Sequence, residues 1–559
     1  MGQPTPQQQA AITATGGVLL SAGAGTGKTA TLIARCLRLI LEEGVNVDEL
    51  LVVTFTNAAA EEMKQRLREA LQARLAGQPE DARLRQQVLL LEGAHISTIH
   101  SFCFELLRAH FAELQLDPGV VVLEESITRP LEKTIARQVV LHAIDQPAVR
   151  QLAQLYCRDS GEQLAEQIRK VYQFYVKQPQ AETCLANERR RWEQTTPEDW
   201  QDQREQIIKA WLLEWQKPAA WQIPKILEAL PSVKGYGGQS PTAAGLRRIE
   251  EQLPEFGRQL AALSEASADG KVAAVFDLAR QLSGSDFWVR GTVNKRGLLK
   301  QFFEEAAELA TWLPTADGDP LQVDWELVRQ PMQTLLELTQ DFAREFSEAK
   351  RALGGVDFSD LEQLALQLLE KKAPIAAAWR QRFKHVLVDE CQDINAAQDA
   401  LLQCLSRRGD QTNLFMVGDV KQSIYRFRLA APELFQGYTR DWQNQPHHQV
   451  LALNENFRSR AALLDFVNDL FHSLLASGWG GMSYGEDDRL HFGQPEGDRS
   501  PLAHHPPEGC GPEHAWADAD CRVELHLVQP AAEGGEEKEG ADSGDDDWGD
   551  LLALEQEAR

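Results

Sequence analysis

A glycine-rich segment near the N-terminus ends in Lys and Thr. It runs from Ala22 to Thr29, directly after the apolar run 18–20. Glycines let the backbone turn its N–H groups toward phosphate oxygens, while Lys28 neutralises charge and the Thr29 hydroxyl can bind Mg²⁺. The pattern G-x-x-x-x-G-K-[ST] is met except at its first position, which is Ala22. The spacing predicts a phosphate-binding loop made of Ala22, Gly23, Ala24, Gly25, Thr26, Gly27, Lys28 and Thr29.

Two adjacent carboxylates, Asp389 and Glu390, follow a second apolar run at 386–388. A buried strand would deliver both side chains to the carboxyl edge of a parallel sheet, where ligands bind. One carboxylate could hold Mg²⁺ through water, and the other could polarise the water that attacks a phosphoanhydride. An Asp-Glu pair is also common on protein surfaces, but its place behind an apolar strand favours catalysis.

A third segment, 418–428, reads GDVKQSIYRFR and combines an amide, aromatic rings and arginines. Gln422 could sense a γ-phosphate. Tyr425 and Phe427 alternate with arginines, as in sites where bases stack on rings and guanidinium groups meet the phosphates of single-stranded nucleic acid. A buried aromatic turn is the alternative. Further on, Arg458 could stabilise charge on a γ-phosphate in the transition state.

The elements that must position these residues are short apolar runs, each followed by a polar tip and a helical pattern. This alternation predicts a parallel α/β sheet. Polar residues at two further tips, Thr56 and Asn57 after one run and Thr98 and His100 after another, lie where such sheets bind ligands. His100 taken alone is more often a structural cap than a ligand. The expected strands lie at 18–20, 50–54, the start of 95–102, 386–388 and 414–417.

Residues 105–352 differ from the flanking sequence. Periodic apolar spacing, many Gln, Glu and Arg residues and few β-branched runs predict an inserted helical domain. Breaks rich in Pro and Gly at 231–241 and 314–320 divide it. Its tryptophans could stack on bases, but helix packing is the favoured role. They are Trp192, Trp200, Trp211, Trp215 and Trp221.

Composition restricts the class of protein. The chain has 559 residues, 43% of them apolar, and a formal charge of −26, which argues against general nucleic-acid affinity but not against a local basic groove. Apolar runs are too short for a membrane span, and the polar N-terminus lacks a signal peptide, so a cytoplasmic protein is expected. The eight cysteines are scattered, and we expect no zinc or iron–sulfur site.

In order and spacing, these segments resemble the UvrD-like family of superfamily 1 DNA helicases over residues 5 to about 470. The resemblance implies a RecA-like P-loop ATPase fold that uses ATP and Mg²⁺. On the nucleotide side, Gln8 and Phe457 would contact adenine, and the loop would bind the phosphates. Asp389 would bind the metal, Glu390 would be the general base, and Arg458 would be an arginine finger.

On the DNA side, the resemblance implies that Gln422 couples the ATP state to DNA and that Phe427 stacks on a base. It also implies 3′-to-5′ unwinding of DNA and contacts to single strands and duplex ends. The residues that would contact DNA or couple it to the nucleotide are Thr56, Asn57, Thr98 and His100.

Within the family, the segments TFTNAAAEEMKQRL and STIHSFC and the long insertion most resemble the AddA group of helicase–nuclease subunits. That group implies double-strand-break repair and recombination, a nuclease elsewhere in the full-length chain, and an AddB-like partner protein. Three alternatives stay open. The chain could bind ATP and DNA without translocating, it could be a monomeric UvrD-type repair helicase, or it could be a P-loop ATPase that does not act on nucleic acid.

The later helicase motifs and a nuclease D…DxK pattern are not found in this sequence, which predicts an incomplete second motor domain. The run at 533–550 is glycine-rich and acidic, and we expect a disordered linker there. The sequence therefore looks like the amino-terminal part of a longer protein. The expected domains are a first ATPase segment, 1–104, the insertion, 105–352, a second ATPase segment, 353–460, and the start of the second motor domain, 461–559.

Overall fold

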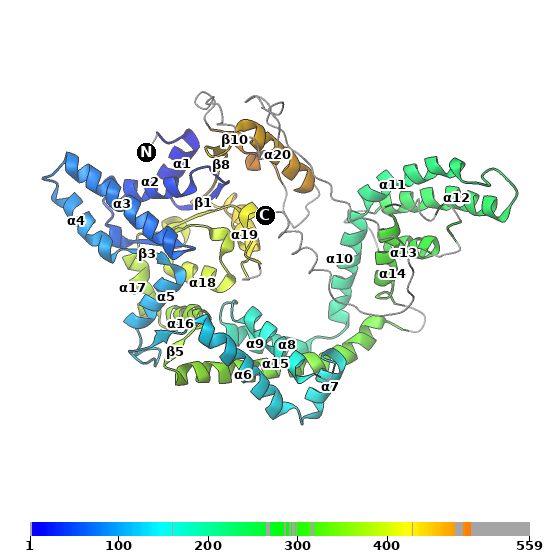
Figure 1. Ribbon diagram of the computed structural model, residues 1–559, viewed down its shortest axis with the longest axis horizontal. Helices are drawn as coiled ribbons and strands as arrows, with labels where there is room; N and C mark the ends of the chain where they lie inside the picture. The colour runs from blue at the N-terminus through cyan, green and yellow to red at the C-terminus, as the bar shows by residue number, and fades with distance from the viewer. Residues whose placement is uncertain are drawn as a thin grey trace, which may run out of the picture. The chain divides into compact units, whose positions relative to one another are not determined.

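The computed structural model divides into two compact units, Met1–Arg458 and Ser459–Arg559, each considered separately below (Figure 1). The residues that the structure describes are 3–158, 160–263, 269–283, 287–289, 292, 297, 299–314, 318–426, 429–475 and 484–493.

A six-stranded parallel sheet forms the centre of the first unit, with the strand order β3-β2-β6-β7-β1-β8 (Figure 1). Each neighbouring pair is parallel, and Leu19 of β1 lies opposite both Met416 of β7 and Val450 of β8. This sheet confirms the predicted parallel α/β fold. The strands are β1 Gly17–Ala22, β2 Leu50–Thr54, β3 His95–Thr98, β6 His385–Val388, β7 Leu414–Gly418 and β8 His448–Leu453.

Helices cover both faces of the sheet because successive strand side chains point to opposite faces. Leu19 belongs to the apolar core on one face, whereas Val18 and Leu20 belong to the core on the other. The first face is covered by α5 Ile99–Ala109, α16 Phe358–Lys371, α17 Ala373–Arg382, α18 Ala396–Leu405 and α19 Pro432–Trp442. The second is covered by α1 Pro6–Thr13, α2 Lys28–Leu41, α3 Asn57–Gly77 and α4 Ala82–Leu90.

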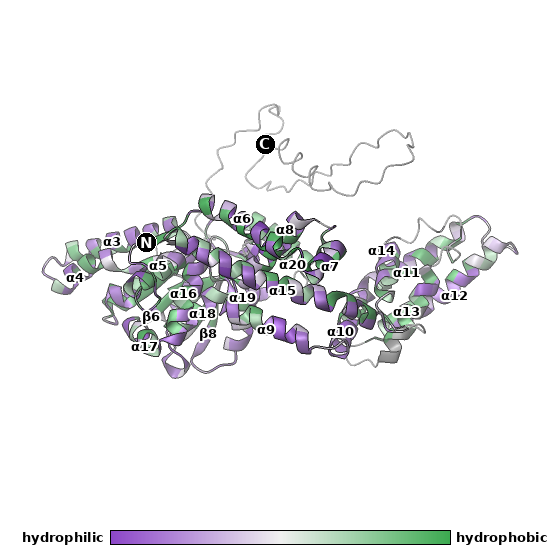
Figure 2. Ribbon diagram, turned by 90° about the horizontal axis from the view of Figure 1, so that it is seen from below, coloured by the Kyte–Doolittle hydropathy of each residue, from purple (hydrophilic) through white to green (hydrophobic). Residues whose placement is uncertain are grey.

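Helix α3 shows how an amphipathic helix packs on this sheet. It buries Ala60, Met63, Leu67 and Leu71, which recur at helical spacing on one face. Hydrophilic residues cover most of the rest of the helix, as Figure 2 shows. The helix therefore contacts the sheet core along a single apolar stripe.

The inserted segment folds into two helical lobes, each with an apolar core of its own. The proximal core draws on α6 Glu125–Ala143, α7 Pro147–Tyr156, α8 Gly161–Tyr175 and the long α15 Pro320–Ala352. The distal core draws on α10 Glu198–Glu214, α11 Gln216–Ala229, α12 Pro241–Ala261, α13 Asp269–Ser283 and α14 Leu299–Ala310. Helix α9, Ala181–Gln194, leads from one lobe to the other.

A short parallel pair joins the two ends of the insertion. Strand β4, Val121–Val122, pairs with β5, Gly355–Val356. The expected boundary at 104/105 falls inside α5, which runs unbroken from Ile99 to Ala109. The chain thus leaves the ATPase fold after α5 and returns to it just before α16.

Most of the tryptophans in the insertion pack against other rings. The Trp192 and Trp325 rings are stacked 5.1 Å apart, and Trp200 lies 6.1 Å from Trp192. Trp211 stacks on Phe302 at 4.9 Å, and Trp215 contacts the same phenylalanine. These contacts support the packing role for four of the five. Trp221 differs, because it is 55% exposed with the Lys225 ammonium 3.2 Å from its ring centroid.

The second unit is described only at 459–475 and 484–493. It contains α20, Ala461–Leu475, and a short strand, β10 His491–Phe492. Asn468 holds these parts together, since its amide donates to the Leu490 carbonyl at 2.8 Å and accepts from the Tyr484 hydroxyl at 2.7 Å. The acidic run 533–550 lies outside the described residues, and the second motor domain stays a prediction. No helix among the described residues is long and apolar enough to cross a bilayer.

Candidate active site

The glycine-rich loop connects β1 to α2, as its sequence predicts. Gly25 and Gly27 have φ angles of +72° and +85°, and Gly27 is the N-cap of α2. This left-handed backbone opens the loop so that the free N–H groups of the first helical turn can face an anion. Ala22 lies in the extended strand β1, where alanine fits as well as glycine. The loop is therefore shaped for phosphate despite the substitution.

Gly25 lies close to the segment that follows β8. A Cβ atom at this position would lie 2.7 Å from the Arg458 Cβ and 2.8 Å from the Asn456 amide nitrogen. We therefore expect Gly25→Ala to weaken ATP binding at least about tenfold, because the loop or the Arg458 segment must shift, and to cost about 1–2 kcal/mol of folding stability. Titration with a fluorescent ATP analogue and a thermal melt measure the two effects.

Gly44→Ala is the matched control for that experiment. Gly44 has nearly the same φ angle, +71°, but no atom lies within 4 Å of the position of its Cβ. It should therefore lose similar stability and keep its ATP affinity. Equal ATP affinities for the two variants would show that crowding at Gly25 has no effect on nucleotide binding.

Lys28 brings three distant segments of the chain together. Its ammonium lies 3.0 Å from a Glu390 carboxylate oxygen and donates to the Gln422 amide oxygen at 3.2 Å. The Lys28 side chain is only 11% exposed, so both contacts are shielded from solvent. Three residues predicted to take part in catalysis thus meet at one point on the carboxyl edge of the sheet.

Asp389 and Glu390 differ in environment, although they are adjacent. Asp389, at the end of β6, is 8% exposed, and burial followed by repulsion from Glu390 raises the pKa of its carboxyl to about 6, although Lys28 opposes this. A buried carboxylate in this state favours a bound cation, and its environment therefore fits Mg²⁺. Glu390 has a φ of +51° and is more exposed, which leaves its side chain accessible to a water molecule.

Two residues that the sequence analysis missed support this arrangement. The Gln392 amide donates to Glu390 at 2.9 Å and accepts from the Asp419 backbone N–H at 3.0 Å. The Asp419 carboxylate in turn accepts from the Gln422 amide at 2.7 Å. Gln392 and Asp419 thereby link the segments that follow β6 and β7. The available signal for Asp419 was its place immediately after the apolar run of β7.

The residues predicted to contact adenine lie beside the loop. Gln8 donates to the Thr26 carbonyl at 3.0 Å and accepts from the Thr5 N–H at 3.1 Å. The Phe457 N–H donates to the Gly25 carbonyl at 2.9 Å, and its ring is 39% exposed. Arg458 follows directly and is exposed. The structure thus brings Gln8, Phe457 and Arg458 to the loop, with Gln8 held by the loop itself.

A buried arginine fixes the helix that carries Gln8. The Arg35 guanidinium, on α2, donates to the Ala11 and Ile12 carbonyls near the end of α1, at 2.9 and 3.2 Å, and lies 4.3 Å from the Phe415 ring centroid. Burial lowers the pKa of Arg35 to about 10. This residue ties α1 to the phosphate-loop helix, and its position inside an apolar helical stripe was the signal for it.

The polar residues at two strand tips act as helix caps. The Thr56 hydroxyl accepts from the Ala59 N–H at 3.1 Å at the start of α3, and Asn57 beside it is exposed. The Thr98 hydroxyl accepts from the Ser101 N–H at 3.3 Å at the start of α5. His100 contacts the Glu362 carboxylate at 2.8 Å. Thr56 and Asn57 are open to a ligand, whereas Thr98 is buried.

An aromatic pair lies at the same edge of the sheet. The Tyr425 ring lies 4.9 Å from that of Phe55, a residue that the sequence analysis missed although it directly follows β2. Arg426 pairs with Glu433 at 2.6 Å, and the neighbouring Ile424 is 70% exposed. This exposure does not favour a fully buried aromatic turn. Phe427 lies outside the described residues.

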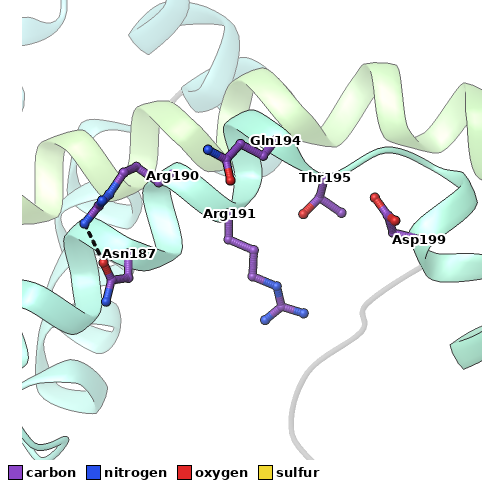
Figure 3. A pocket seen from close by; sticks show the side chains of 6 residues that line it. All are labelled: Asn187, Arg190, Arg191, Gln194, Thr195 and Asp199. Carbon is purple, nitrogen blue, oxygen red and sulfur yellow. Dashed lines mark hydrogen bonds between the residues drawn. The ribbon is translucent and has the colours of Figure 1, made fainter.

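A separate pocket of about 470 Å³ lies in the insertion (Figure 3). The Arg190 guanidinium donates to the Asn187 side chain there at 2.6 Å. All its lining residues come from α9, the turn after it and the start of α10, so the pocket is distinct from the candidate active site. They are Asn187, Arg190, Arg191, Gln194, Thr195 and Asp199.

Comparison with known proteins gives consistent matches. Residues 4–443 match the family model for the UvrD/REP helicase N-terminal domain. The chain is 35% identical to the AddA subunit of the ATP-dependent helicase/nuclease of Moorella thermoacetica, over 99% of this chain and 42% of that protein. The proteins of the same name from Pelotomaculum thermopropionicum and Geobacillus kaustophilus are each 34% identical, over 97% and 88% of this chain and 43% and 41% of theirs. The chain spans about two-fifths of the length of these relatives.

Proposed function

Because this chain belongs to the UvrD/REP helicase family, we propose that it is the N-terminal ATPase part of an ATP-dependent DNA helicase that acts in DNA repair. The observation that carries the proposal is the meeting of Lys28, Glu390 and Gln422 at the end of the phosphate loop. A lysine for the phosphates, a carboxylate for the attacking water and an amide for the γ-phosphate are the parts that ATP hydrolysis requires.

In the proposed mechanism, ATP phosphates replace Glu390 as the partner of Lys28. Glu390, freed from that ion pair, orients the attacking water and accepts its proton. Thr29 and Asp389 would hold Mg²⁺, which neutralises phosphate charge when it is bound. Arg458, next to the loop, stabilises the charge that develops on the γ-phosphate.

The Gln422 segment is the proposed connection to DNA. It continues from the ATP site to Tyr425 and Phe427, and we propose that these rings stack on the bases of a single strand. Thr56, Asn57, Thr98 and His100 are proposed to line the same path or to couple it to the nucleotide.

The names of the relatives support the finer proposals. These names describe one component of a larger helicase/nuclease, which implies a partner protein. We propose an AddB-like partner, duplex DNA ends as substrate and a role in double-strand-break repair and recombination in the cytoplasm. The proposed polarity is 3′ to 5′. The same names favour these proposals over that of a monomeric repair helicase.

ATP turnover with and without single-stranded DNA tests the proposal. We expect a short oligothymidylate to raise the turnover of this chain several-fold, because the Gln422 segment would connect bound DNA to the ATP site. If ATP binds and is hydrolysed at the same rate with and without DNA, the nucleic-acid role is rejected.

The second candidate is an ATP- and DNA-binding module that does not translocate. It is favoured by one observation, that the chain spans only about two-fifths of its relatives. A strand-displacement assay separates the candidates, because binding alone unwinds no duplex. DNA-stimulated turnover without displacement would support the module.

A further inference from the structure

Glu362, on α16, is a fully buried carboxylate with four side-chain donors. One oxygen lies 2.8 Å from His100 Nε2 and accepts from the Gln398 amide at 2.6 Å. The other lies 3.1 Å from the Lys177 ammonium and accepts from the Asn395 amide at 3.2 Å. The Glu362 side chain has no exposed surface. Every acceptor direction of the carboxylate is therefore engaged by protein.

These donors come from three functionally different parts of the chain. His100 lies in the first turn of α5, just after the tip of β3. Asn395 is the N-cap of α18 and forms a capping box with Gln398. Asn395 also lies only five positions after Glu390, and the intervening turn is held to Glu390 by Gln392. Glu362 thus joins a proposed DNA contact to the segment of the proposed general base.

The third part is the helical insertion. Lys177 follows α8, and its carbonyl accepts from the Ala397 N–H at 3.0 Å. The next residue on α16, Gln363, donates to the carbonyls on both sides of Lys177, those of Val176 and Gln178, at 2.8 and 2.7 Å. The insertion is therefore fixed to α16 and α18 at this point.

The charge of Glu362 is essential to this network. Burial alone would raise the pKa of Glu362, but Lys177, His100 and Gln398 outweigh it and hold the value at about 2. A neutral amide at this position would keep the shape but would place an N–H group among donors. His100 and the start of α18 would then lose their common acceptor.

We propose that Glu362 is a positioning residue through which DNA near His100 accelerates ATP hydrolysis at Glu390. It transmits a shift of His100 to the N-terminus of α18 and so to the Glu390 turn, while the insertion supplies Lys177 as the fixed counter-charge. This inference rests on the helicase function proposed above and adds a residue outside the ATP site.

Glu362→Gln tests it. We expect basal ATP turnover and ATP affinity close to those of the wild type, and a loss of about tenfold in the ratio of DNA-stimulated to basal turnover. The matched control is Glu370→Gln, an exposed carboxylate on the same helix, which should keep the wild-type ratio. Thermal melts of each variant show whether it is folded.

A second variant covers the case in which Glu362→Gln does not fold. Glu362→Gln combined with Lys177→Met removes both charges of the buried pair, which usually costs less stability than removing one. It too should lose DNA stimulation. If both variants fail to fold, Glu362 is a structural residue and the inference is rejected.

The other results also decide. A folded variant with the wild-type stimulation ratio, or an equal fall in basal and stimulated turnover, overturns the positioning role and leaves the proposed function intact. A wild-type chain whose turnover does not respond to DNA overturns both. An equal loss in Glu370→Gln overturns the specific role of Glu362.

Discussion

Glu390→Gln is expected to lower ATP turnover about 10²- to 10⁴-fold while ATP still binds. The amide has the same shape and keeps an oxygen for the Lys28 ammonium, which lies 3.0 Å from the carboxylate in the structure. It cannot accept a proton from the attacking water. Phosphate release measures turnover, and titration with a fluorescent analogue measures binding.

Asp410→Asn provides the control for Glu390→Gln. Asp410 is an exposed carboxylate in the turn before β7, so its loss should change neither quantity. Turnover at the wild-type rate in Glu390→Gln would rule out Glu390 as the general base. Loss of ATP binding in the same variant would mean that the carboxylate mainly positions Lys28.

Lys28→Ala is expected to weaken ATP binding about 10- to 100-fold, because a charge-assisted hydrogen bond to phosphate is lost. Turnover should fall further, since the lysine also counters charge in the transition state. Stability should change little, because the partner Glu390 is 34% exposed and can be hydrated. The same two assays, with a thermal melt, measure all three effects.

Two variants make this prediction specific. Lys384→Ala removes a lysine that pairs with Glu49 and is 45% exposed, and it should leave ATP binding unchanged. Lys28→Arg keeps the charge but changes the geometry, and it should restore binding better than turnover. Wild-type ATP affinity in Lys28→Ala would contradict the proposed contact between Lys28 and the phosphates.

The central strands were predictable because each is a short apolar run that ends in a polar tip. The run at 50–54 has the bounds of β2, and those at 386–388 and 414–417 differ from β6 and β7 by one residue. β8 was missed. Its residues are mostly half-buried at the sheet edge, so its sequence, HQVLAL, lacks a continuous apolar run. The β4–β5 pair was too short to give a pattern.

Local motifs identified the candidate site only where a residue's type implied its chemistry. Lys28, Glu390 and Gln422 were singled out this way, and the structure brings them into contact. Glu362 and Arg35 carried no such signal, because their roles depend on partners far away in the sequence, Lys177 for one and the end of α1 for the other. Such long-range contacts appear only in the folded chain.

The strand order also has a consequence for synthesis on the ribosome. When residues 1–104 have emerged, β2 and β3 can pair, but both neighbours of β1 are missing, because β7 and β8 end at Gly418 and Leu453. The distal lobe, whose core lies within 208–310, needs no later residue. It can therefore fold while β1 and the nucleotide loop still await their partners. The ATPase sheet is among the last parts of this chain to form, and its apolar strands need protection until then.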